Sequence, residues 1–376
     1  SVVFTLNYVS DPANKARQQT VIGWIEKAEK ISKYKVRIIS KKPFPAAIDY
    51  LATAIAIHPA KYYKEVGPTG MNLKPVGSGP YKVVEHIPGK SLTLERNKDY
   101  FKDSPKAQPK IGKIRIRFIP DRQTQMAEVM SGGEDFIMHV PKDQADKLKS
   151  LPQLQVQSGN TMRIVFLLMN TRDGSPAPQL KDIRVRQAIA HAIDRQAILK
   201  NIVGGGEILN SICTPSQVGC TSKGVKVYNY DPALAKKLLA EAGFPNGFDV
   251  DLMAYRERPQ TEAMINYLSA VGIKPKLSFM QYAAMRDLAR GNKTSITHQT
   301  WGSNLVNDLS ASTPVYFGGG ADDVSRNPEV IKLLKEGDST VDLKKRQELY
   351  QKALSIIADQ AYAVPLWTLP VYYVAN

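Results

Sequence analysis

The stretch Val76-Gly-Ser-Gly-Pro-Tyr-Lys-Val-Val84 decides the fold of this 376-residue chain, because three later segments fall into order around it. After its glycines, residues 81–86 and 91–95 are predicted to form the two strands of a hairpin about Pro88-Gly89. The stretch Gly77-Ser-Gly79 matches half of a dinucleotide-binding fingerprint, but a strand follows it instead of a helix. No helix N-terminus is therefore placed to bind a phosphate there.

The three later segments complete the pattern. They are Asp182-Ile-Arg-Val-Arg-Gln-Ala-Ile-Ala-His-Ala-Ile-Asp-Arg195, Tyr230-Asp-Pro-Ala-Leu-Ala-Lys-Lys-Leu-Leu-Ala-Glu-Ala-Gly243 and Arg346-Gln-Glu-Leu-Tyr-Gln-Lys-Ala353. In order and spacing, the four segments resemble the family 5 extracellular solute-binding proteins, which are the peptide, nickel and opine receptors of ATP-driven importers. The resemblance covers nearly all of the chain. It implies an α/β protein with a periplasmic-binding-protein-like type II fold: two lobes with a hinge, plus part of an extra subdomain.

Helical and strand periods alternate along the chain, which is typical of the α/β class. Two helices carry clear start signals. Asp231 is placed to cap a helix with Pro232 in its first turn and Gly243 at its end, and Asp182 is placed to cap another. Further helices are predicted over 44–57, 122–131, 260–270, 282–289, from 328 onward and over 342–357, and further strands over 35–39, 273–279 and 295–301.

The resemblance also implies the division into lobes. Residues 1–75 are expected to be the remainder of the extra subdomain and its return to lobe I, 76–158 lobe I, 159–364 lobe II, and 365–376 a return to lobe I. Family members continue beyond both ends of the matching region, so we expect the chain to be incomplete at both ends. No signal peptide is recognisable at Ser1. A periplasmic or extracellular location is therefore implied by the resemblance alone.

The composition indicates a globular protein and excludes other classes. Hydrophobic residues make up 43% of the chain, and no apolar run is long enough to span a bilayer. The formal net charge of +16 raises the question of nucleic-acid binding. In the densest basic run, 102–117, Ile114 and Ile116 alternate with Arg115 and Arg117, as in a half-exposed strand. Aromatic residues are not interleaved with these charges, so no nucleic-acid partner is predicted.

The only two cysteines, Cys213 and Cys220, enclose Pro215 and Gly219, which favour a tight turn. The pair is either a short disulfide loop or two unpaired thiols. No further cysteine or nearby histidine completes a four-ligand metal site. The turn chemistry, together with the export that the resemblance implies, favours the disulfide.

The segment Thr300-Trp-Gly-Ser-Asn-Leu-Val-Asn-Asp308 is the main candidate for a binding site. In peptide-binding relatives, a similar segment follows a strand, its tryptophan stacks on the ligand, and a carboxylate three residues later pairs with the α-amino group. The resemblance therefore implies ligand contacts for Trp301, Gly302, Ser303 and Asn304. Because Asn304 is an amide without charge, we predict that a free α-amino group is poorly accepted. Asp308 is an alternative counter-ion, and simple core packing is the alternative role for Trp301.

Other candidates come from looser parts of the resemblance. Arg258 lies near the position where dipeptide-binding relatives hold the ligand carboxylate with an arginine, and Arg256 is nearly as good a candidate. Tyr255 is expected to help line the pocket. His139 follows a strand that faces the hinge in relatives, and Asn160 stands where the chain crosses between lobes. The alternative for both arginines is a solvated surface position, and the alternative for His139 is an ordinary hydrogen-bonded histidine.

The predicted function is that of the substrate-binding component of an ABC importer. The protein is expected to be a monomer without cofactor or metal that closes its lobes on a peptide-like or other small organic solute and delivers it to a permease in the inner membrane. The sequence contains no Gly-x-Ser-x-Gly, His-Glu-x-x-His or phosphate-binding-loop motif. A secreted hydrolase or transferase with an unrecognised site, a nickel-chelate receptor of the same family and a non-transport interaction module are the alternatives.

Overall fold

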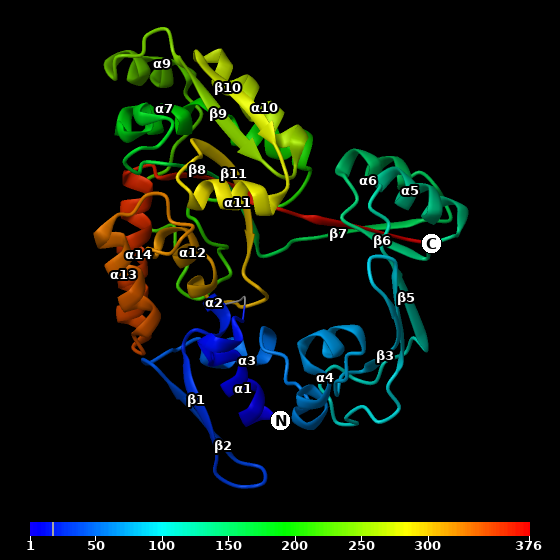
Figure 1. Cartoon of the computed structure of the whole chain (residues 1–376). Helices are drawn as coiled ribbons and strands as arrows, with labels where there is room; N and C mark the ends of the chain where they lie inside the picture. The colour runs from blue at the N-terminus through cyan, green and yellow to red at the C-terminus, as the bar shows by residue number, and fades with distance from the viewer. Residues whose placement is uncertain (17–18) are drawn as a thin grey trace. The chain divides into compact units, whose positions relative to one another are not determined.

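The computed structural model describes residues 1–16 and 19–376, which pack into two compact units (Figure 1). Unit 1 contains residues 1–42, 55–137 and 376, and unit 2 contains residues 43–54 and 138–375. These units are defined by how closely their residues pack, and they do not show which residues belong to which lobe. The lobe boundaries after residues 75, 158 and 364 therefore stay a prediction.

Unit 1 is built around two small antiparallel sheets. The order of the three-stranded sheet is β3-β4-β5, and its first two strands form the hairpin predicted about Pro88-Gly89, where the amide of Lys90 donates to the carbonyl of Ile87. The helices of this unit are α1 (Val2–Ser10), α2 (Gln19–Ile22), α4 (Ala60–Leu73) and α5 (Arg122–Ser131), and its strands are β1 (Ile25–Lys30), β2 (Val36–Ser40), β3 (Tyr81–Ile87), β4 (Ser91–Arg96) and β5 (Lys113–Arg117). β6 (Phe136–Met138) ends at Met138, the residue at which the chain passes from unit 1 to unit 2.

Unit 2 is organised by a five-stranded mixed sheet of order β10-β9-β11-β8-β12. The pairs β10·β9 and β11·β9 are parallel, whereas β8 runs antiparallel to both β11 and β12. The strands are β8 (Arg163–Met169), β9 (Phe248–Ala254), β10 (Ile273–Phe279), β11 (Ile296–Gly302) and β12 (Ala363–Thr368).

Helices cover both faces of this sheet. The apolar run of β8 divides between two cores, because successive strand residues point to opposite faces. Val165, Leu167 and Met169 belong to the core with α7, α9 and α10, and the alternate residues 164, 166 and 168 belong to the core with α12, α13 and α14. The helices are α7 (Ile183–Ala192), α9 (Pro232–Glu241), α10 (Arg258–Ala270), α11 (Tyr282–Arg290), α12 (Thr313–Phe317), α13 (Pro328–Ser339) and α14 (Leu343–Asp359).

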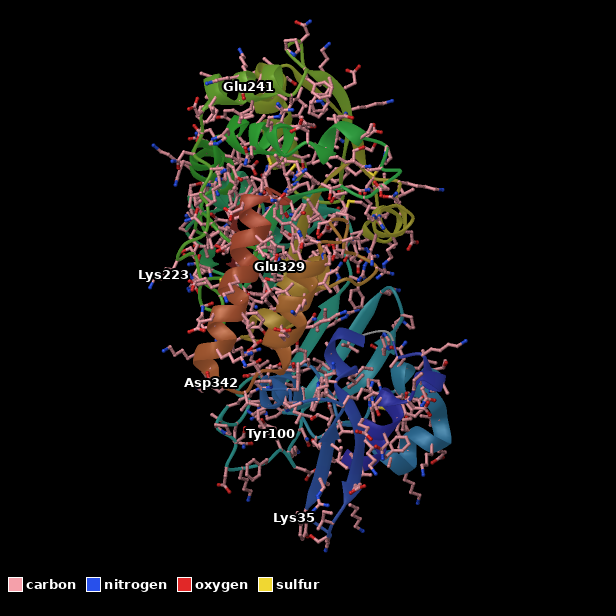
Figure 2. All side chains as sticks on the ribbon, turned by 90° about the vertical axis from the view of Figure 1, so that its left-hand side faces the viewer. Lys35, Tyr100, Lys223, Glu241, Glu329 and Asp342 are labelled. Carbon is pink, nitrogen blue, oxygen red and sulfur yellow. A yellow bond between two sulfur atoms is a disulfide. The ribbon has the colours of Figure 1, made fainter. Side chains whose placement is uncertain are left out.

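The predicted helix caps are present. The carboxylate of Asp182 accepts from the Arg184 amide, that of Asp231 from Leu234 and that of Asp342 from Lys345. Figure 2 shows Asp342 at the start of α14 and Glu241 at the end of α9. Such caps satisfy amide donors that a helix leaves free in its first turn.

One predicted helix is shorter than expected. The helix predicted over 44–57 is α3 (Ala47–Thr53). Pro45 accounts for the late start, because a residue that precedes proline, here Phe44, is disfavoured in helical conformation.

Two chain segments leave the five-stranded sheet beside β8 and β12. β7 (Gln155–Gly159) pairs antiparallel with β13 (Val371–Ala375). At the junction, the Leu369 amide donates to the Arg163 carbonyl at 2.8 Å, and the Thr161 hydroxyl donates to the Leu369 carbonyl at 2.6 Å. The remaining short elements of unit 2 are α6 (Lys142–Leu148), α8 (Arg195–Ile198), and single turns at Pro178–Lys181, Leu199–Val203 and Leu309–Ala311. Within residues 1–16 and 19–376, no helix combines the length and the apolar character needed to cross a bilayer.

Candidate functional site

The candidate site lies at one edge of the five-stranded sheet. The parallel strands β9, β10 and β11 all end at this edge, and the antiparallel β8 begins there, with Arg163 opposite Gly302. In open α/β sheets, ligands bind outside the carboxyl ends of the strands. Tyr255, Arg256, Trp301 and Arg163 are therefore the residues at or beside the strand ends where a ligand is expected.

Trp301 is the second-last residue of β11 and is half-buried. Its indole Nε1 donates to the Ala311 carbonyl at 2.8 Å, and its ring meets Tyr316 edge-on, with centroids 5.7 Å apart. Tyr316 is itself buried against Phe166, and burial, followed by the nearby Tyr282 and Tyr255, raises its pKa well above the usual range. The orientation of the indole is thus fixed by protein contacts, and the residue packs against the core beneath it while remaining only half-buried.

The loop after Trp301 presents an exposed polar tip. Ser303 is buried, whereas Asn304 and Leu305 are exposed and have positive φ angles of 53° and 67°. The Val306 amide donates to the Ser303 carbonyl and closes the turn. Asparagine visits the left-handed region readily, but leucine does so at a cost of about 1 to 3 kcal/mol. Strain at an exposed position next to Asn304 is typical of a functional loop.

The base of this loop is held by a buried ion pair. The Asp308 carboxylate receives two hydrogen bonds from the Arg346 guanidinium, at 2.7 and 2.8 Å, and a third from the Ser310 amide. Arg346 also donates to the Gly337 carbonyl and to the Tyr350 hydroxyl. Asp308 is only 3% exposed, and its charge is compensated inside the protein. The suggestion that Asp308 serves as a counter-ion for a ligand ammonium is therefore wrong.

A hydrogen-bonded cluster links the ends of β8, β9 and β11. The Tyr255 hydroxyl lies 2.6 Å from Oγ1 of Thr300 and 3.1 Å from its carbonyl oxygen. The guanidinium of Arg163 donates to the same Oγ1 at 3.3 Å. The ring of Tyr255 also contacts Tyr282, with centroids 4.8 Å apart. Tyr255, Thr300 and Arg163 are thus brought together, although they come from three separate parts of the sequence.

His298 lies two residues before Thr300 on β11 and is buried. Its Nδ1 lies 2.7 Å from Oγ1 of Thr261, while its Nε2 has no partner among the described residues. Burial, and then the positive charge of Arg256, lower its pKa to about 3. His298 is therefore neutral at physiological pH and contributes no positive charge near the site.

The two arginines predicted to hold a carboxylate both have acidic neighbours. Arg256 is half-buried and pairs with Glu257 at 3.0 Å. Arg258 opens α10, pairs with Glu262 at 2.8 Å, and has 61% of its side chain exposed. The alternative role of a solvated surface residue therefore fits Arg258 better than it fits Arg256.

The other predicted residues lie at the crossing segments. His139 is exposed between β6 and α6, with a positive φ of 61°, and Asn160 is exposed directly after β7. A ligand contact for either residue stays a prediction. Within the described part of the chain, no group of three His, Cys, Asp or Glu side chains is arranged to hold a metal ion.

The disulfide between Cys213 and Cys220 is present and supports the candidate loop. Between the two cysteines, the Val218 amide donates to the Asn307 carbonyl, and the Val218 carbonyl accepts from the Leu309 amide. The side chain of Gln217 donates to the Asp308 carbonyl at 3.1 Å. The disulfide loop therefore fixes the segment that carries Asp308.

Removing this disulfide is expected to lower the free energy of unfolding by about 2 to 3 kcal/mol, because the cross-link restricts the unfolded chain. The test compares urea unfolding of the double variant Cys213→Ser/Cys220→Ser with that of the wild type. A reductant should destabilise the wild type and leave the variant unaffected. Equal stability of the two proteins under oxidising conditions would contradict the prediction.

Sequence reasoning did not identify Arg163, Tyr282 or Tyr316 as residues of this edge, and it quoted Thr300 only as the start of the candidate segment. A signal was available for Arg163. It is a charged residue that immediately precedes six consecutive apolar residues, 164–169, all of which are buried in β8. A charged residue at the end of a buried strand lies where the sheet meets solvent or a ligand.

Comparisons with known proteins agree with this architecture. The family model described as "Bacterial extracellular solute-binding proteins, family 5 Middle" matches residues 1–323. Heme-binding protein A of Haemophilus influenzae is 24% identical over 363 residues, which cover 91% of this chain and 64% of that protein. Glutathione-binding protein GsiB of Pectobacterium atrosepticum is 27% identical over 376 residues, which cover 94% of this chain and 70% of that protein. The solved structure of the solute-binding protein MoaA of A. tumefaciens R10, in complex with mannopinic acid, is 26% identical with a TM-score of 0.81, and the match covers 100% of this chain and 77% of MoaA.

Proposed function

Because the chain belongs to the bacterial extracellular solute-binding proteins of family 5, we propose that it is the substrate-binding component of an ABC importer. It captures a peptide-like or other small organic solute between two lobes, outside the cytoplasm, and delivers it to a membrane permease. The family consists of solute-binding proteins and not of enzymes. The protein works as a monomer and needs neither a cofactor nor catalysis.

The observation that carries this proposal is the position of Trp301 and the way its side chain is held. Its indole is held by Ala311 and Tyr316, the residue is only half-buried, and it stands at the end of the strand where α/β sheets bind ligands. A rigid aromatic ring that is only half-buried is suited to stack on a solute. The proposed site contains Tyr255, Arg256, Arg258, Trp301, Gly302, Ser303, Asn304, His139 and Asn160.

The charges of the loop indicate the class of solute. Asn304 supplies no charge, and the carboxylate of Asp308 is occupied by Arg346. A solute with a free ammonium group would therefore lack a counter-ion at this loop, which is costly in a desolvated site. The proposed solute carries an anionic group and no free primary amine. The relative MoaA has been solved with an acid, mannopinic acid, which supports the anionic part of the proposal.

The function is tested by identifying what the purified protein carries. Mass spectrometry of the small molecules released on denaturation should reveal a solute, and isothermal titration of that solute should show tight binding without turnover. Catalytic turnover would instead support a hydrolase or transferase. Binding to a protein partner with no small solute involved would support an interaction module. Either of these results would overturn the proposal.

Asn304→Asp is expected to shift the solute preference. The wild type should bind N-acetyl-Gly-Leu better than Gly-Leu, and the variant should reverse this preference by about tenfold in favour of Gly-Leu, because the new carboxylate pairs with the α-amino group. Aspartate tolerates the left-handed backbone at this position. Isothermal titration of both peptides measures the effect.

Asn307→Asp is the matched control. It introduces the same charge into the same exposed loop, three residues further on. We expect it to leave the preference between the two peptides unchanged. If the wild type bound Gly-Leu at micromolar concentration and as tightly as the acetylated peptide, the proposed exclusion of free amines would be wrong.

A further inference from the structure

Arg163 occupies a special position in unit 2. It is the first residue of β8 and lies opposite Gly302, the last residue of β11. It is half-buried, and a Cβ at position 302 would lie 3.3 Å from its Nη2. The guanidinium thus lies against a strand end that has no side chain, directly after Trp301. A larger residue at 302 would crowd it.

The hydrogen-bonding capacity of Arg163 is largely unused. A guanidinium has five N–H donors, yet the only described hydrogen bond of this side chain is the one from Nη1 to Oγ1 of Thr300. Two other arginines without a described carboxylate partner, Arg186 and Arg195, each donate three hydrogen bonds to backbone carbonyl oxygens. Each of those two arginines thus makes three described hydrogen bonds to the protein, whereas Arg163 makes one.

The charge of Arg163 is also unbalanced. Among the described residues, no carboxylate lies within ion-pair distance of its guanidinium, and the nearby Arg256 already pairs with Glu257. Burial, and then the charge of Arg256, lower the pKa of Arg163. Two cations therefore share one carboxylate at this end of the sheet. A partly desolvated positive charge without a partner is unfavourable, and a bound anion would compensate it.

We propose that the guanidinium of Arg163 binds the carboxylate group of the solute. A guanidinium fork matches a carboxylate in two-point geometry, and its unused donors lie at the end of the sheet where the parallel strands also end. Thr300, which also bonds to Tyr255, fixes the orientation of the guanidinium from behind. The inference rests on the proposed function and names its solute class as a carboxylate-bearing molecule. It assigns the role first expected of Arg258 to Arg163.

The test uses a matched pair of probes, N-acetyl-Gly-Leu and its C-terminal amide, titrated into the purified full-length protein by calorimetry. We expect the wild type to prefer the acid. Arg163→Gln should weaken binding of the acid by about 10- to 100-fold and leave binding of the amide unchanged, because only the acid offers a charged partner. Arg163→Lys should be intermediate, since it keeps the charge and loses the fork. The control Arg184→Gln removes an arginine from the surface of α7, where it pairs with Asp182, and should bind both probes like the wild type.

The outcomes separate this inference from the proposed function. Equal weakening of acid and amide by Arg163→Gln would indicate a structural role and overturn the inference, as would loss of the acid preference in Arg258→Gln alone. Recovery of a co-purified solute without an acidic group would overturn the inference and leave the receptor function standing. If neither probe bound and no solute co-purified, the proposed function would fail together with the inference.

Discussion

Replacing Arg346 by alanine is expected to lower the free energy of unfolding by about 3 to 5 kcal/mol. Arg346 and Asp308 are 2% and 3% exposed, and the guanidinium donates to both oxygens of the carboxylate. Removing the arginine leaves a buried carboxylate without compensation, and it also removes donors to Gly337 and Tyr350. Urea unfolding followed by circular dichroism measures the loss.

A second substitution shows whether the uncompensated charge is the cause. Adding Asp308→Asn to Arg346→Ala removes the buried charge, so the double variant should be more stable than the single variant. The control is Arg258→Ala, whose exposed pair with Glu262 should contribute little. A loss below about 1 kcal/mol in Arg346→Ala would show that this ion pair does not hold the loop.

Replacing Trp301 by alanine is expected to weaken solute binding by about 100- to 1000-fold. A rigid aromatic side chain at the centre of a site contributes a large contact area at a small cost in entropy. Because the indole also packs on Tyr316 and bonds to Ala311, its position is fixed before the solute arrives. The measurement is isothermal titration with the solute recovered from the purified protein.

Trp301→Phe separates stacking from the rest of the structure. Phenylalanine keeps an aromatic face but loses the hydrogen bond to Ala311 and the second ring of the indole. We expect this variant to retain most of the affinity, within about tenfold of the wild type. If the alanine variant bound the solute as the wild type does, while remaining folded by circular dichroism, Trp301 would be a packing residue and the proposed site would be wrong.

The fold could be predicted from the sequence down to single caps, because the signals involved are local. A cap such as Asp231 on α9 joins residues three apart, and the same holds for Asp342 on α14. The hairpin about Pro88-Gly89 and the Cys213–Cys220 disulfide span short separations too. For α3, Pro45 was a local signal of a later start, but the prediction of a helix over 44–57 followed the apolar run instead.

The candidate site was predicted only in part, because its contacts are not local. The hydrogen bond between Arg163 and Thr300 joins residues 137 apart in sequence, and no motif announces it. Asp308 shows the opposite error. Its offset from Trp301 in the sequence suggested a ligand contact, but its carboxylate is paired with Arg346 of α14. Whether a charged side chain is satisfied inside the protein depends on tertiary packing, which neither periodicity nor a family resemblance describes.

The hydrogen bonds that tie Leu369 to Arg163 and Thr161 have a mechanical consequence. Two chain segments, one before β8 and one after β12, leave the sheet side by side and continue as the paired strands β7 and β13. Strands paired in this way resist sliding of one along the other, because sliding would break several of their hydrogen bonds together. Arg163 itself accepts one of the hydrogen bonds at this junction, so a solute bound by its guanidinium would contact the residue at which the paired segments join the sheet.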